Sequence, residues 1–143
     1  MSGETDLDKL LASMSPQLGA GEFVFCSFAD AQYGDYGALR PVAVVVEPEG
    51  LTLVITREVA DAAGIPYESV FRQITLQVHS SLDAVGLTAA FSVRLAEHDI
   101  SANVIAGYYH DHIFVQCDQV ETAVRVLEAL ACGVESASPD QLI

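Results

Sequence analysis

The order of elements in the second half of the chain constrains its fold more than any other feature. The stretch FRQITLQVH, residues 71–79, alternates apolar and polar side chains, which is typical of a strand with one face in a core. A helical apolar stripe follows at 87–98, and then two short strands joined by a tight connection at 107–110. A last amphipathic helix is expected to be capped by Asp118 and to end at Gly133. This half therefore predicts the order strand, helix, strand, strand, helix.

The first half of the chain is divided by clear turn and cap signals. Residues 5–14 carry a helical apolar stripe that Pro16 ends, and EFVFCSF at 22–28 is an apolar strand. The segment ADAQYGDYGALRP, 29–41, holds two glycines and closes with a proline, which predicts a surface loop. The runs VAVVVE and LTLVIT flank the turn signal PEG, and a short helix follows over 56–64. This half therefore predicts helix, three strands, helix.

Both halves fit pieces of the split βαβ, ferredoxin-like plan. Neither half supplies four strands and two helices by itself. The sequence thus predicts an α+β fold of two small βαββαβ modules with antiparallel sheets that share or exchange elements. We expect an N-terminal module over 1–70, a C-terminal module over 71–133 and a tail over 134–143. An open sheet edge favours association with another chain, so a homodimer is expected.

The charge of the chain narrows the classes of partner. Asp and Glu outnumber Lys and Arg by 20 to 6, which gives a formal net charge of −14. Such a chain repels phosphate groups, so neither nucleic acid nor a membrane surface is an expected partner. No apolar run approaches the roughly 20 residues that span a bilayer, and we expect a cytoplasmic protein. The three cysteines form no CxxC pair, so neither a zinc ribbon nor a redox dithiol is encoded, and we expect buried reduced thiols. No cofactor is expected.

Residues 81–115, SLDAVGLTAAFSVRLAEHDISANVIAGYYHDHIFV, resemble the ACT domain, especially that of the regulatory part of aspartate kinases. In that pattern a strand leads through a short loop to a glycine on which a helix begins, and a strand with an Asn-Val/Ile pair follows. Gly86 and Leu87 match the glycine step, and residues 100–105 match the second strand. Over nearly its whole length the chain resembles small standalone bacterial proteins built from two ACT-like modules.

The resemblance implies a non-enzymatic regulatory protein that binds a small molecule between two paired modules, and we expect this small molecule to be an amino acid. A possible effector protein would then act in trans. Carried over residue by residue, the resemblance implies a ligand site made of Asp83, Ala84, Val85, Gly86, Leu87, Asn103, Val104 and Ile105.

Simple chemistry agrees with such a site for a zwitterion. Free N–H groups at a helix start attract a carboxylate, and Gly86 lets the backbone approach a ligand closely. Asp83 can accept a hydrogen bond from an ammonium group, and Asn103 offers both a donor and an acceptor. Each residue also has a purely structural alternative: Gly86 ends a loop, Asp83 caps the helix, and Asn103 satisfies a neighbouring backbone group.

The sequence HDH at 110–112 carries a competing hypothesis from another class. Two histidines two residues apart on a strand share a face, and the ferredoxin-like order brings His79 to the same corner. Three imidazoles can bind Zn²⁺ and leave one position open, so a metal-dependent enzyme using His79, His110 and His112 is the alternative. Phe114 is expected on this outer face with the histidines. A ligand-free assembly module is the remaining alternative.

Overall fold

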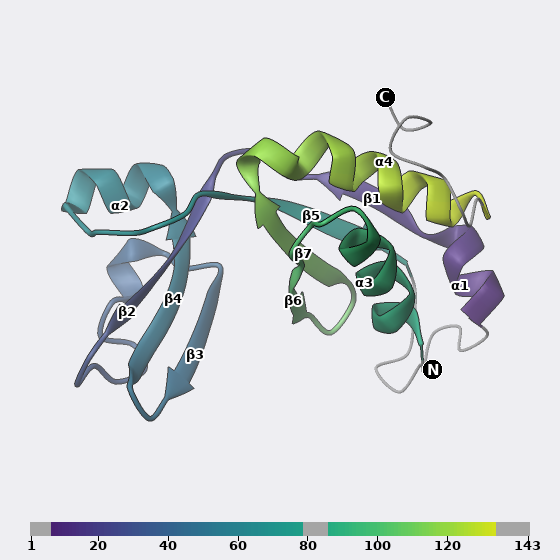
Figure 1. Cartoon of the computed structure of the whole chain (residues 1–143). Helices are drawn as coiled ribbons and strands as arrows, with labels where there is room; N and C mark the ends of the chain where they lie inside the picture. The colour runs from purple at the N-terminus through teal and green to yellow at the C-terminus, as the bar shows by residue number, and fades with distance from the viewer. Residues whose placement is uncertain (1–6, 79–85, 134–143) are drawn as a thin grey trace. The chain divides into compact units, whose positions relative to one another are not determined.

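The computed structural model describes residues 7–78 and 86–133, which group into two compact units (Figure 1). Unit 2 is formed by residues 20–72. Unit 1 is formed by residues 1–19 together with residues 73–143, as far as these are described. The chain therefore starts in unit 1, builds the whole of unit 2, and then returns to complete unit 1.

In its described residues, unit 1 holds a four-stranded sheet with three helices. Its sheet order is β1-β5-β7-β6, and its elements are α1 (Leu7–Ser13), β1 (Ser15–Leu18), most of β5 (Phe71–Gln77), α3 (Leu87–Glu97), β6 (Asn103–Ala106), β7 (Asp111–Gln116), the 3-10 turn η2 (Cys117–Gln119) and α4 (Val120–Ala131). The order β5, α3, β6, β7, α4 is the start of a ferredoxin-like module. Its fourth strand is β1, which pairs antiparallel with β5 from the other end of the sequence.

The core of unit 1 lies between one face of this sheet and its helices. Alternation along β5 and β7 points a row of aliphatic side chains to that face. These side chains form one buried cluster with residues of α1, α3 and α4; its fully buried members are Leu10, Ile74, Leu76, Phe91, Leu95, Ile113, Val115, Ala123 and Leu127. The start of α3 and the strand β6 are therefore held by a shared core.

Unit 2 has the same plan with one helix missing. Its elements are β2 (Phe23–Phe28), the 3-10 turn η1 (Gly37–Leu39), β3 (Ala43–Glu47), β4 (Gly50–Thr56) and α2 (Arg57–Ala63). The strands β2 and β3 both pair antiparallel with β4, and β2 also meets the start of β5 at Phe23 and Phe71. Between β2 and β3, where a ferredoxin-like module has its first helix, the chain forms the loop 29–42 with only η1 in it.

Local signals explain why α2 begins and ends where it does. The Oγ1 of Thr56 accepts a hydrogen bond from the backbone N–H of Val59 at 3.2 Å, which satisfies a free donor of the first turn. Gly64 closes the helix with φ at +67°, a left-handed conformation that favours glycine. Both positions were predicted from the sequence and are confirmed.

The α+β class, the antiparallel pairing and the two ferredoxin-like modules are confirmed. The module limits 1–70 and 71–133 stay a prediction. Pro16 was predicted only to end a helix, but it lies inside β1, opposite Leu76. A proline is tolerated there because β1 is at the edge of the unit 1 strand order.

One further prediction was wrong, and another needs a correction. Asp118 was predicted to cap α4, but it lies inside the 3-10 turn η2, which precedes the helix. The N-cap is Gln119, and its side chain makes no capping hydrogen bond. By alternation Phe114 shares the face of His112, as predicted, but it is only 1% exposed. Ile113 and Val115 are fully buried on the opposite face, so both faces of β7 are covered. No helix among the described residues has the length and hydropathy that a membrane span requires.

Candidate functional site

The first half of the predicted ligand site lies at the start of α3. Gly86 is the N-cap, with φ at +99°, and its carbonyl accepts the first helical bond from Ala90 N–H at 2.9 Å. A Cβ added at Gly86 would lie 3.3 Å from Cδ2 of Leu7. Leu87 is buried in the core of unit 1. The first turn of α3 therefore presents its free N–H groups from a firmly packed position.

The second half of the predicted site lies on β6. The Nδ2 of Asn103 donates to the carbonyl of its cross-strand partner Phe114 at 3.1 Å. The structural alternative for Asn103, that it satisfies a neighbouring backbone group, is thus observed for its donor. Its Oδ1 has no hydrogen bond within the described residues, so an acceptor remains. Val104 packs against the unit 1 core, and Ile105 lies opposite His112.

The loop that would join these two halves is not described. Asp83, Ala84 and Val85 lie outside the described residues, as does His79. The eight-residue ligand site implied by the resemblance therefore stays a prediction.

The histidines of the HDH stretch have different surroundings. The Nδ1 of His112 lies 3.0 Å from the hydroxyl of Thr75 and 3.2 Å from Nε2 of Gln73. With the amide of Gln73 in this orientation, its Nε2 donates and Nδ1 accepts, which corresponds to a neutral imidazole. Burial, followed by the nearby charge of His110, lowers the pKa of His112, which agrees with a neutral ring.

The remaining groups at this corner are also partly removed from water. Burial raises the pKa of Asp111, against the opposing effect of the two histidine charges. The Nδ1 of His110 is buried and has no hydrogen-bond partner among residues 7–78 and 86–133. Among the described residues no group of three His, Cys, Asp or Glu side chains is arranged to hold a metal ion. Since His79 is not described, the zinc hypothesis itself stays untested.

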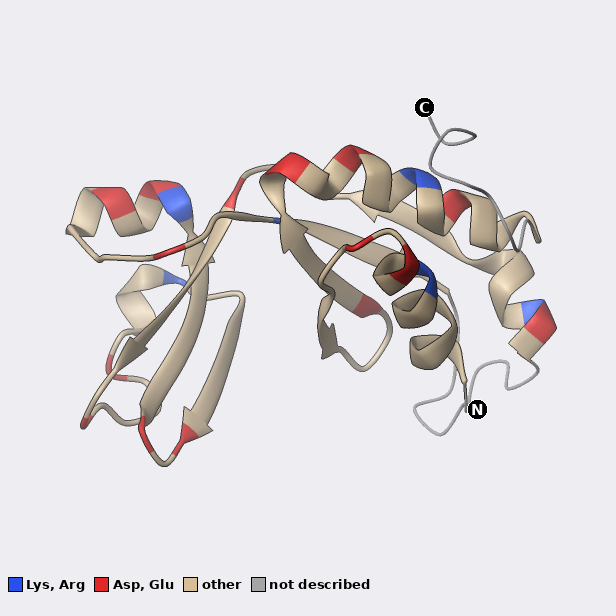
Figure 2. Ribbon diagram, viewed as in Figure 1, with Lys and Arg blue, Asp and Glu red and all other residues tan. Residues whose placement is uncertain are grey.

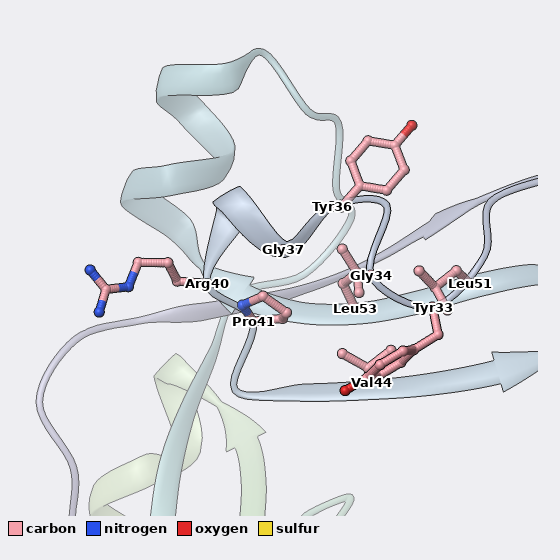
Figure 3. A pocket seen from close by; sticks show the side chains of 9 residues that line it. All are labelled: Tyr33, Gly34, Tyr36, Gly37, Arg40, Pro41, Val44, Leu51 and Leu53. Atoms are coloured by element: carbon pink, nitrogen blue, oxygen red, sulfur yellow. The ribbon is translucent and has the colours of Figure 1, made fainter.

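A pocket of about 550 Å³ lies in unit 2, under the loop 29–42 (Figure 3). We call it the loop pocket; it is lined by Tyr33, Gly34, Tyr36, Gly37, Arg40, Pro41, Val44, Leu51 and Leu53. The last three are aliphatic side chains of β3 and β4 that face the core of this unit. The loop pocket thus opens onto the sheet face that the first helix of a ferredoxin-like module would cover.

The wall of the loop pocket is aromatic. The ring of Tyr36 stacks on Phe28, with ring centroids 3.9 Å apart and planes 19° apart, which fixes that part of the loop. Tyr33 is 78% exposed. The sequence predicted only a surface loop over 29–41 and assigned no role to Arg40. The sequence feature that could have drawn attention to Arg40 is its position as a cation beside a proline, at the end of a loop rich in glycine and tyrosine.

Both halves of the chain match models of the same kind of domain. Models described as ACT domain match residues 2–72 and residues 68–129. A search of curated protein sequences gave no match.

Solved structures with the same fold cover most of the chain. A Vibrio cholerae protein of unknown function, described as a possible transport protein, is 54% identical, with a TM-score of 0.81; the match covers 89% of this chain and 97% of that one. An Agrobacterium tumefaciens protein is 15% identical (TM-score 0.64, coverage 82% and 89%). The regulatory subunit of aspartate kinase from Thermus flavus is 11% identical (TM-score 0.56, coverage 82% and 96%). The last two similarities concern the fold alone.

Proposed function

The chain belongs to the ACT-domain family, with two such domains in tandem, and from this premise we propose that it is a non-enzymatic regulatory protein that binds an amino acid. ACT domains are typically regulatory modules that bind small molecules. The observation that carries the proposal is the tandem match over residues 2–129. A cytoplasmic location and an effector protein in trans belong to the same proposal.

The proposed site has complementary groups for the two charges of an amino acid. The free N–H groups at the start of α3 suit the carboxylate, because the helix dipole adds a positive potential there. The Oδ1 of Asn103 suits the ammonium group, since it has no other hydrogen bond within the described residues. Asp83 would supply a negative charge to the same group, as the resemblance implies.

Binding should stabilise the folded protein against heat. Among the twenty standard amino acids, we expect at least one to raise the melting temperature, by an amount that corresponds to about 2.7 kcal/mol at 100 times its Kd. Gly86→Ala should remove this response, because alanine is strained at φ +99° and its Cβ would crowd Leu7, so the start of α3 should shift. Differential scanning fluorimetry over the panel measures both effects.

Gly133→Ala is the matched control for this experiment. Gly133 has φ at +80°, so the substitution has a comparable backbone cost, but among the described residues no atom beyond its own helix lies within 4 Å of the added Cβ. This variant should melt at a lower temperature than the wild type and still respond to the ligand. A panel without any response would contradict amino-acid binding and favour the assembly module. Equal responses from the Gly86 and Gly133 variants would place the ligand elsewhere.

We also propose that the protein is a homodimer that uses β3. In the strand order of unit 2, β3 is the end strand, and Val45 and Val46 are 49% and 71% exposed. An apolar edge strand with free backbone groups favours pairing with another strand. Val46→Lys should raise the dissociation constant of the dimer at least about tenfold, because the ammonium group would lose water at the contact.

Sedimentation velocity over a dilution series measures this dissociation constant. Val93→Lys is the control, because Val93 is 55% exposed on α3 and the charge change is the same. It should leave the dimer intact. A monomer at all concentrations, or equal weakening by both substitutions, would refute β3 as the contact.

A further inference from the structure

The loop pocket has a charge that is unusual for this chain. The protein carries 20 acidic and 6 basic residues, and the acidic ones are spread over both units (Figure 2). Yet the lining of the loop pocket contains one cation, Arg40, and no carboxylate. The nearest acid in the sequence of the loop, Asp35, is engaged by the backbone N–H of Gln32 at 2.7 Å. The pocket is therefore a local exception to the negative charge of the protein.

Arg40 is also the one basic residue without a side-chain partner in the part of the chain that the structure describes. Arg57 is bridged to Glu22, and Arg94 to Glu97. The other three basic residues, Lys9, Arg72 and Arg125, have interactions of their own. In Figure 3 the guanidinium of Arg40 extends outward at the end of the pocket opposite Tyr33. An anion held by Arg40 would therefore lie at the rim, in contact with water.

The backbone of Arg40 has an unusual conformation. Its φ and ψ are 53° and 55°, a left-handed conformation that residues other than glycine rarely adopt, and its N–H donates to the carbonyl of Gly37 at 3.0 Å. This conformation closes η1 and places the arginine stem beside Pro41 in the pocket wall. The loop therefore has a charged residue, Arg40, at a position where glycine would fit with less backbone strain.

We propose that the loop pocket binds a small aromatic carboxylate. The ring would lie on the aliphatic floor of Val44, Leu51 and Leu53, next to the tyrosines, and the carboxylate would pair with Arg40 at the rim. The volume of about 550 Å³ is within the range of pockets that hold small organic ligands. This site is in unit 2, and it is separate from the amino-acid site proposed at α3 and β6 of unit 1.

The test uses phenylacetate as the probe, with phenylacetamide as its uncharged analogue. The full-length protein, with ¹³C-labelled Leu and Val methyl groups, is titrated with each compound and followed by NMR. Phenylacetate should shift the methyl signals of Val44, Leu51 and Leu53 in a saturable way and bind about tenfold more tightly than phenylacetamide. Arg40→Gln should remove this preference and leave the affinity for phenylacetamide unchanged.

Two variants separate the charge of Arg40 from other effects. Arg40→Lys keeps the charge and should retain part of the preference for the carboxylate. Arg57→Gln lowers the net charge of unit 2 by the same amount, but Arg57 does not line the loop pocket, so the preference should remain in full. An absence of shifts at the three methyl groups, or equal affinity for the two compounds, would overturn the proposal.

The same spectra distinguish this proposal from the proposed function. An amino acid bound in unit 1 should shift the methyl signals of Leu87 and Val104, and Gly86→Ala should abolish only those shifts. Phenylacetate binding in unit 2 should persist in that variant. Either site can therefore fail without the other.

Discussion

Replacing Phe91 with alanine should lower the free energy of unfolding of unit 1 by about 3–5 kcal/mol. Phe91 is 0% exposed at the centre of α3 and belongs to the cluster that joins the sheet and helices of unit 1. Alanine would leave a cavity in a core that can close only partly. Urea denaturation followed by circular dichroism measures the loss.

Val93→Ala provides the control on the same helix. Val93 is exposed, so its truncation should change the free energy of unfolding by less than about 0.5 kcal/mol. If Phe91→Ala cost no more than Val93→Ala, α3 would not be packed on the sheet as described. The proposed ligand site at the first turn of α3 would then lose its rigid support.

Replacing Gly50 with alanine should destabilise unit 2 by about 3 kcal/mol. Gly50 opens β4 with φ at +151°, where a side chain is strained, and its added Cβ would lie 2.6 Å from the carbonyl oxygen of Phe28. The obstacle is backbone in the paired strand β2, so no side-chain rotation can relieve it. Hydrogen exchange should show the loss of protection in β2 and β4.

Substitutions at two other glycines of unit 2 separate the cost of the positive φ from the cost of the steric clash. Gly64 has φ at +67° but open space around its added Cβ, so Gly64→Ala should cost about 1 kcal/mol from backbone strain alone. Gly37 has neither a positive φ nor a neighbour within 4 Å, and alanine there should be close to neutral. Equal costs at Gly50 and Gly64 would mean that β2 and β4 are not as close as described.

Local signals in the sequence predicted much of the fold. Thr56 and Gly64 bound α2 because a cap and a left-handed stop need only their nearest neighbours. Alternation placed Ile74 and Leu76 in the core for the same kind of local reason. The strand β1 was missed because it has four residues, one of them Pro16, and its partner β5 is far away in the sequence.

The loop pocket depends on more than local sequence. The glycines and the proline of residues 29–41 predicted a surface loop, and the structure has a loop there with the short turn η1 in it. The sequence did not show that Leu51 and Leu53 would lie beneath the loop, because this follows from the missing first helix of the module. The role proposed for Arg40 follows only from its neighbours in space.

The central claim, that the protein binds an amino acid, is tested most directly by equilibrium dialysis against a mixture of the twenty standard amino acids. Amino-acid analysis of both chambers then shows what the protein retains. Because the net charge of −14 attracts cationic amino acids without specific binding, the buffer should contain about 150 mM salt, where charges are screened beyond about 8 Å. Gly86→Ala, which has the same charge, corrects for any remaining excess. We predict an excess of one amino acid beside the wild-type protein that the variant does not retain; equal concentrations in both chambers for every amino acid would contradict the account.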